Sequence, residues 1–323
     1  MQTYSLPNTD LTWSRLGYGC MQIGGKWDAS PLTQTERTRA AALLDAACEV
    51  GITLFDHADI YTRGKSESVF GEVLQQRPGL RAQILLQSKC GIRFPDDPRP
   101  GLPGRFDFSY EHIVRSVEGS LRRLQTDYLD VLLLHRPDPL VEPEEVARAF
   151  DELQTAGKVR HFGVSNHTPG QMALLRKYVR QPLVVNQLEL NLLHSEMIED
   201  GVLANQNANH YTGQTGILDY CRLHGIHIQA WSPVANGRLI DPPAKAGEQV
   251  RKAAAAVARL AKAKDTTREA IALAWLLRHP AGIQPIVGTT NVDRLRASAK
   301  ADAVELSREE WYGLWVAARG AMP

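Results

Sequence analysis

Short apolar runs alternate with amphipathic stretches along most of the chain. Nearly unbroken apolar segments such as 129–134 indicate strands that are buried on both faces, as in a parallel sheet. Between these segments apolar residues recur at helical spacing, and Thr33 with Glu36 and Ser307 with Glu310 have capping-box spacing. The pattern predicts strands at 16–19, 52–55, 84–86, 129–134, 159–164, 183–185, 226–230 and 283–287, and helices at 35–50, 66–76, 113–124, 144–156, 170–178, 216–223, 249–263, 268–278 and from 307 onward.

Eight strands that alternate with helices predict an α/β protein. We expect a (β/α)8 TIM barrel with an N-terminal hairpin and two additional helices, as a single domain over residues 1–323. The competing fold, an open doubly wound sheet, would normally carry a G-x-G-x-x-G turn after its first strand. The sequence has no such turn there, so the barrel is favoured.

Composition narrows the class of protein. With 43% hydrophobic residues, 23% charged residues and a net charge of +1, the chain has no broad field for nucleic acid or an anionic membrane. Its four cysteines include no C-x-x-C pair, and no segment has the apolar length of a signal peptide core or a membrane span. We therefore expect a cytoplasmic protein with a small-molecule partner. Oligomeric state is not indicated.

Chemically capable side chains follow the predicted strands, beginning with the segment 51–61, GITLFDHADIY. Asp56, Tyr61, Lys89 and His135 stand just past three strand ends, which meet at one face of a barrel. We expect Lys89, held and kept charged by Asp56, to lower the pKa of the phenol. Tyr61 would then protonate a carbonyl oxygen that His135 orients. Because no side chain supplies hydride, a nicotinamide cofactor is implied.

These motifs resemble the aldo-keto reductases, in particular bacterial cytoplasmic general oxidoreductases. The segments HADIY, SKCGI, HRPDPL, GVSN and AWSP carry the resemblance in the order of that family. It implies Asp56, Tyr61, Lys89 and His135 as the catalytic tetrad, and a substrate pocket with Trp27, Tyr61 and His135. It implies cofactor contacts from Gly19, Met21, Ser165, Asn166, Gln187, Trp231, Ser232, Gly237, Gly288, Thr289, Thr290, Arg294 and Ser298.

The resemblance also bears on the choice of cofactor. Ser165, Asn166 and Gln187 would bond the nicotinamide carboxamide, and Trp231 would stack on its ring. Many family members have a lysine where this chain has Gly288, so Arg294 is the remaining cation for the adenosine 2′-phosphate. We expect NADPH, with NADH less favoured, in the reduction of aldehydes or ketones to alcohols.

Other interpretations stay open. A protein of this fold could sense redox state through bound nucleotide or regulate a partner. A metal-dependent barrel hydrolase could use His57 and Asp59, although adjacent strand residues point to opposite faces, so His57 and Asp56 do not enter one site. Arg93, Arg99 and Arg105 in the loop 91–107 could bind an anionic substrate, but a solvated loop is favoured. The polar segment 190–214 receives no assignment.

Overall fold

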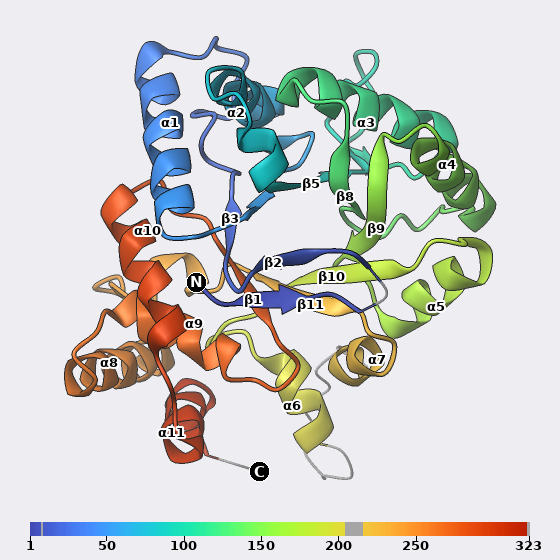
Figure 1. Cartoon of the computed structure of the whole chain (residues 1–323). Helices are drawn as coiled ribbons and strands as arrows, with labels where there is room; N and C mark the ends of the chain where they lie inside the picture. Colours follow the sequence, from blue (N-terminus) through green and yellow to red (C-terminus); the bar gives the residue numbers. More distant parts are fainter. Residues whose placement is uncertain (8, 204–215, 322–323) are drawn as a thin grey trace.

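The structure, a computed structural model, describes residues 1–7, 9–203 and 216–321. Within these residues, eight parallel strands close into a barrel and helices surround it (Figure 1). The predicted (β/α)8 fold is thereby confirmed. In their order around the barrel the strands are β3 (Gly17–Gly19), β4 (Leu54–Asp56), β5 (Leu85–Cys90), β8 (Leu129–Leu134), β9 (Val159–Ser165), β10 (Leu183–Glu189), β11 (His227–Trp231) and β12 (Gln284–Val287).

The helices lie outside the barrel, and α8 and α11 are additional to the strand–helix alternation and pack against each other. The predicted capping boxes at Thr33 and Ser307 are present. The α-helices are α1 (Gln34–Glu49), α2 (Lys65–Gln75), α3 (Tyr110–Leu124), α4 (Pro143–Thr155), α5 (Pro169–Tyr178), α6 (Glu196–Val202), α7 (Ile217–Leu223), α8 (Glu248–Ala263), α9 (Arg268–Leu277), α10 (Val292–Ala299) and α11 (Arg308–Arg319). Short 3-10 turns are η1 (Tyr61–Gly64), η2 (Leu80–Gln83), η3 (Ala235–Gly237) and η4 (Lys300–Ala303).

An N-terminal hairpin covers one end of the barrel. Its strands β1 (Thr3–Ser5) and β2 (Thr12–Ser14) pair antiparallel and cross the barrel in Figure 1. Trp13 is fully buried and packs in one apolar cluster with Leu54 and Val131 of the barrel interior. The hairpin precedes β3 directly, so this apolar plug closes the N-terminal end and leaves the C-terminal end of the strands for a site.

Several boundaries differ from the prediction. Strands β5 and β10 continue past their expected ends at 86 and 185, through Gln87, Lys89 and Gln187. These polar residues interrupt the apolar pattern. They nevertheless belong to the strands, because they form hydrogen bonds with other side chains inside the barrel. The loop 91–107 also holds a hairpin of β6 (Ile92–Arg93) and β7 (Arg105–Phe106), and helices α6 and α10 were not expected. From residue 204 onward the segment 190–214 lies outside the described residues.

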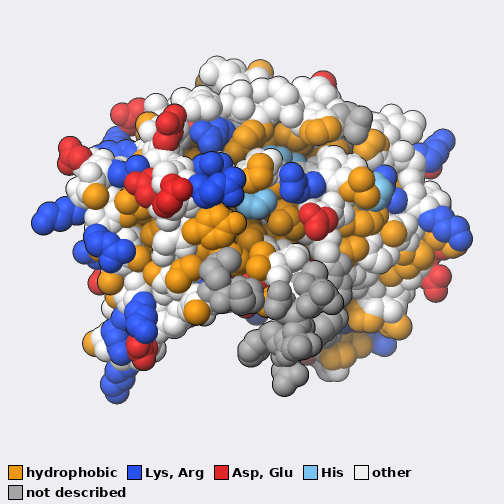
Figure 2. Space-filling model, turned by 90° about the horizontal axis from the view of Figure 1, so that it is seen from below, with side chains coloured by type: hydrophobic (Ala, Val, Ile, Leu, Met, Phe, Trp, Pro, Cys, Tyr) orange, Lys and Arg blue, Asp and Glu red, His pale blue; other side chains and the backbone are white. Residues whose placement is uncertain are grey.

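The surface carries charges of both signs. On the face that Figure 2 shows, Lys and Arg side chains are interspersed with Asp and Glu and with apolar side chains, in keeping with a net charge of +1. In the part of the chain that the structure describes, no helix has the length and apolar character needed to cross a membrane.

Candidate active site

The C-terminal ends of three barrel strands bring the predicted catalytic side chains together. Asp56 is the last residue of β4, Lys89 lies near the end of β5, and His135 directly follows β8. Tyr61 begins the turn η1 that follows β4. Side chains alternate along a strand, and this alternation directs Asp56 and Lys89 into the interior, where both are almost fully buried.

Lys89 lies at the centre of this group. Its Nζ donates to Oδ1 and Oδ2 of Asp56, each at 2.7 Å, and to the backbone oxygen of His57 at 2.8 Å. The same nitrogen lies 3.1 Å from the Tyr61 Oη. The His135 ring meets the Tyr61 ring edge-on, with 5.8 Å between their centroids. The ammonium group is therefore held by oxygens on several sides and contacts the phenol at the same time.

Burial and charge set the protonation states here. Burial by itself lowers the pKa of Lys89, but Asp56 and Tyr61 outweigh it and the pKa is raised. Burial raises the pKa of Tyr61, and the attraction of Lys89 offsets only part of this. The expected lowering of the Tyr61 pKa is therefore wrong. Moving a phenolate out of water destabilises it by more than the attraction of Lys89, which is already paired with Asp56, stabilises it. Burial, followed by the charges of Lys89 and Arg136, lowers the pKa of His135 far below its usual value, so its ring is neutral.

A left-handed turn places Tyr61. Thr62, Arg63 and Gly64 have φ values of 46°, 59° and 84°. For the threonine and the arginine this region costs about 1–3 kcal/mol each. The Thr62 hydroxyl donates to the Tyr61 backbone oxygen at 2.8 Å and lies 2.9 Å from the Ser66 hydroxyl. These buried contacts stabilise a strained turn next to the phenol.

His57 and Asp59 face away from the tetrad. The His57 ring packs edge-on against Phe70 of α2 at 4.6 Å between centroids, and burial lowers its pKa to about 3. Burial, followed by the charge of Glu67, raises the pKa of Asp59 to about 8. Within the described ranges of the chain, no group of three or more His, Cys, Asp or Glu side chains is arranged to hold a metal ion.

A cavity of about 840 Å³ opens above the tetrad, a volume typical of ligand and cofactor sites. Two of the predicted site residues do not line this cavity among the described residues: Lys89, which lies beneath it, and Thr290. The remaining predicted site residues all line it: Asp56, Tyr61 and His135 of the tetrad, Trp27, and Gly19, Met21, Ser165, Asn166, Gln187, Trp231, Ser232, Gly237, Gly288, Thr289, Arg294 and Ser298. One cavity thus joins the two expected sites.

Comparison with known proteins matches the geometry. The model of the aldo/keto reductase family matches residues 15–314. The chain belongs to this family. It is 37% identical over 312 residues to the oxidoreductase YcsN of Bacillus subtilis, and 37% identical over 311 residues to a 6-dehydroglucose reductase of Agrobacterium fabrum, with 96% of both chains covered in each case. The solved holo form of the aldo-keto reductase AKR11C1 from Bacillus halodurans has a TM-score of 0.77 at 26% identity, covering 100% of this chain and 98% of that one. The resemblance inferred from the motifs is confirmed.

In this aldo-keto reductase the residues expected around the nicotinamide carboxamide form a bonded row. The Ser165 hydroxyl donates to the Gln187 backbone oxygen at 2.8 Å. Asn166 Nδ2 donates to Ser165 Oγ at 2.9 Å and to the His135 backbone oxygen at 3.2 Å. Asn166 Oδ1 accepts from Trp231 Nε1 at 3.1 Å. Both amide hydrogens of Asn166 are thus used within the protein, and the indole ring is fixed in the cavity wall.

The end of the cavity expected for the adenosine phosphate lies at the start of α10. Asn291 caps this helix, accepting from the Arg294 N–H at 2.9 Å. The side chain of Arg294 lines the cavity and has no hydrogen-bond or ion-pair partner among the described residues. Ser298 Oγ donates to the Arg294 backbone oxygen at 2.8 Å, so its hydrogen is already in use. Backbone N–H groups and one available cation make this end suited to a phosphate.

Sequence reasoning did not identify Arg136 as a site residue. This exposed side chain follows His135, lines the cavity and pairs with no residue that the structure describes. Arg93, which was considered for an anionic substrate, is instead bound to Asp97 at 2.8 Å and to Asp107 at 2.7 Å. The position of Arg136 next to the histidine at a strand end was the signal that could have revealed it.

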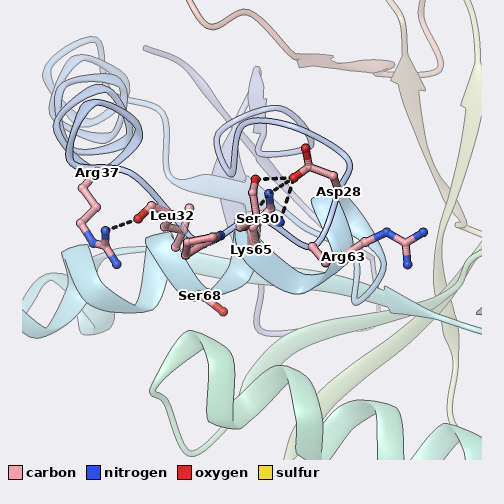
Figure 3. Close-up of a pocket in the computed structure, with 9 residues that line it drawn as sticks. Asp28, Ser30, Leu32, Arg37, Arg63, Lys65 and Ser68 are labelled. Atoms are coloured by element: carbon pink, nitrogen blue, oxygen red, sulfur yellow. Dashed lines mark hydrogen bonds and ion pairs between the residues drawn. The ribbon is translucent and has the colours of Figure 1, made fainter.

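A second hollow of about 370 Å³ lies beside the start of α2 (Figure 3). Its basic side chains are largely neutralised, because Lys65 Nζ contacts Asp28 at 3.3 Å and Arg37 Nε contacts Glu72 at 2.7 Å. Arg63 extends away from these pairs in Figure 3. None of the four tetrad residues lines this hollow, so the larger cavity is the candidate active site.

Proposed function

We propose that this protein uses NADPH to reduce aldehydes or ketones to alcohols, with Tyr61 as the proton donor. The observation that carries the proposal is the 3.1 Å contact between Lys89 Nζ and Tyr61 Oη at the floor of the cavity. A phenol that borders a cavity and touches a charged lysine is suited to protonating an oxygen that becomes an alkoxide. The partner is a small carbonyl compound.

The raised pKa of Tyr61 supports this role. A proton donor must hold its proton until the transition state, and burial keeps the phenol protonated at neutral pH. After the transfer, the charge on the phenolate is stabilised by Lys89, which Asp56 keeps charged. The neutral His135 ring, packed against Tyr61, is placed to orient the carbonyl oxygen by a hydrogen bond.

The cavity fits a nicotinamide dinucleotide. Trp231 offers an aromatic wall, and Gln187 offers a side-chain oxygen to an amide. At Gly237 and Gly288 no atom lies within 4 Å of where a Cβ would stand, so a ligand can approach the backbone closely. When bound, the cofactor supplies the hydride. Arg294 and the start of α10 would hold the 2′-phosphate of NADPH.

We further propose that the protein works in the cytoplasm. Its four cysteines, Cys20, Cys48, Cys90 and Cys221, are free thiols, which suits a reducing compartment.

The test is Tyr61→Phe, assayed by NADPH oxidation with a panel of small aldehydes and ketones. We include a 6-dehydro-sugar in the panel because a similar protein is named 6-dehydroglucose reductase. Turnover should fall roughly 10²–10⁴-fold, the usual contribution of a general acid. The dissociation constant for NADPH should stay the same, since Phe keeps the ring contacts of Tyr61 with Trp27 and His135.

The matched control is Tyr312→Phe, which changes a tyrosine exposed on the outer helix α11 and should leave turnover unchanged. A Tyr61→Phe protein that reduces aldehydes at the wild-type rate would contradict the mechanism. Tight NADPH binding by the wild type without turnover on any carbonyl compound would favour the redox sensor instead.

A further inference from the structure

Four glutamines form a polar layer across the barrel, between the tetrad and the apolar plug. They are Gln87 on β5, Gln187 on β10, Gln229 on β11 and Gln284 on β12, and none is more than 2% exposed. Barrel interiors of this type are normally filled by layers of branched apolar side chains. Burying an amide is costly unless its hydrogen bonds are made, so this layer requires a specific arrangement.

The layer spans the barrel through hydrogen bonds to Asp56. Gln87 Nε2 donates to Asp56 Oδ1 at 2.6 Å and to Gln229 Oε1 at 2.8 Å. Gln187 Nε2 donates to the same two oxygens, each at 3.0 Å. Strands β4 and β10 lie opposite each other in the barrel, with three strands between them in each direction, and the same holds for β5 and β11. The bonds of Gln187 to Asp56 and of Gln87 to Gln229 therefore cross the barrel interior. Asp56 thus accepts hydrogen bonds from the side-chain amides of Gln87 and Gln187 in addition to those from Lys89.

Gln229 connects the members of the layer. It accepts from Gln87 and Gln187, and its own Nε2 donates to Gln87 Oε1 at 3.2 Å and to Gln284 Oε1 at 2.9 Å. Gln284 ends the chain by donating to the Ser14 backbone oxygen at 2.7 Å. Gln87, Gln187 and Gln229 therefore each have two acceptors for the two hydrogens of their amide.

The carboxylate sets the direction of the whole layer. If the amide of Gln87 or Gln187 were reversed, a carbonyl oxygen would face the Asp56 carboxylate at about the same distance, which is repulsive. The nitrogen of Gln187 is thus fixed toward Asp56. Gln187 is also the member of the layer that lines the cavity, and its Oε1 accepts no hydrogen bond from any described residue. This oxygen remains as an acceptor for a ligand.

We propose that Gln87 and Gln229 are positioning residues for the reaction, although neither lines the cavity. Gln229 holds Gln187 so that its Oε1 accepts an N–H of the bound nicotinamide cofactor. Gln87 holds the Asp56 carboxylate against Lys89. This inference rests on the proposed function. A layer that only filled the barrel would need neither the fixed direction nor the contacts with Asp56.

The first experiment compares Gln229→Met with Gln284→Met. Both changes keep the length of the side chain, remove hydrogen bonds within the layer and should lower the melting temperature. Of the two residues changed, only Gln229 forms a hydrogen bond with Gln187. We expect the NADPH dissociation constant, measured by equilibrium fluorescence titration, to rise ~10-fold in Gln229→Met, as for the loss of about 1.4 kcal/mol. In Gln284→Met it should stay at the wild-type value.

Equal dissociation constants in both variants and the wild type would overturn the role of Gln229. A wild type that binds no nicotinamide cofactor would instead refute the proposed function. If Gln229→Met does not fold, Gln87→Met decides. It removes the bond of Gln87 to Asp56 and its two bonds with Gln229, but leaves Gln187 bonded to both Asp56 and Gln229. We expect its kcat to fall ~10-fold with a wild-type NADPH dissociation constant, on the scale of one lost bond to a charged group. A wild-type kcat would overturn the inference.

Discussion

Asp59, which follows β4 and lies close to Tyr61 in the chain, has a carboxyl group that stays protonated at neutral pH. Burial, and then the charge of Glu67, raises its pKa from 3.8 to about 8. Glu67 itself is fully buried and accepts from Ser88 Oγ at 2.6 Å and from Arg123 Nε at 2.8 Å. Glu67 thus has an arginine partner, whereas the Asp59 carboxyl is buried beside it and keeps its proton at neutral pH.

The change Asp59→Asn removes this titration while keeping the shape of the side chain. In the unfolded chain the carboxyl loses its proton near pH 3.8, whereas in the folded protein it keeps it until about pH 8. Between these values the folded state binds more protons, so the free energy of unfolding falls as pH rises. The slope is about 1.4 kcal/mol per pH unit, so the variant should gain up to about 3 kcal/mol on the wild type between pH 5 and pH 7.

Denaturant unfolding at pH 5, 6 and 7 measures this difference. Asp293→Asn is the matched control, because that side chain is 93% exposed, and its difference from the wild type should not change with pH. Buried histidines such as His57 also titrate, but they are the same in both proteins and cancel in the comparison. If the difference between Asp59→Asn and the wild type is constant with pH, Asp59 is ionised in the folded protein and the reasoning is refuted.

Two further changes test the cavity. Arg294→Ala should raise the dissociation constant of NADPH ~10-fold or more and leave that of NADH nearly unchanged, since a hydrogen bond to a charged group contributes about 1.5–3 kcal/mol. Titration with both cofactors measures this, and equal losses would exclude a contact with the 2′-phosphate. Arg136→Gln should lower kcat/KM ~10-fold for an aldehyde that carries a carboxylate, because no described residue neutralises this guanidinium in the cavity. A neutral aldehyde of equal length is the control, and the same loss for both would remove Arg136 from anion recognition.

Much of the fold was predictable because most barrel strands contain a short apolar run and are followed by a helix whose apolar residues recur at helical spacing. Strand β8 matches its predicted bounds, since every residue from Leu129 to Leu134 is buried. Strand β5 does not, because Gln87 and Lys89 look like the end of a strand and only their partners across the barrel make them interior residues. The local sequence pattern therefore identifies strands well where the buried side chains are apolar, and poorly where the buried side chains are polar.

The candidate site divides in the same way. Residue type and position after a strand sufficed to select Asp56, Tyr61, Lys89 and His135, because parallel strands of a barrel present their C-terminal ends on one face. The sign of the Tyr61 pKa shift was not accessible, since it depends on how far burial outweighs a lysine that is already shared with Asp56.

The sequence alone therefore determined the strand–helix alternation, the family and the chemical groups at the strand ends. Tertiary structure decided which amides meet across the barrel, that Arg93 is paired while Arg136 is not, and which buried carboxyl stays neutral. The reason is physical: composition and spacing are local, whereas hydrogen-bond direction and desolvation depend on neighbours that are distant in the chain. Gln87 and Gln229, far apart in sequence and 2.8 Å apart between Nε2 and Oε1, are the clearest case.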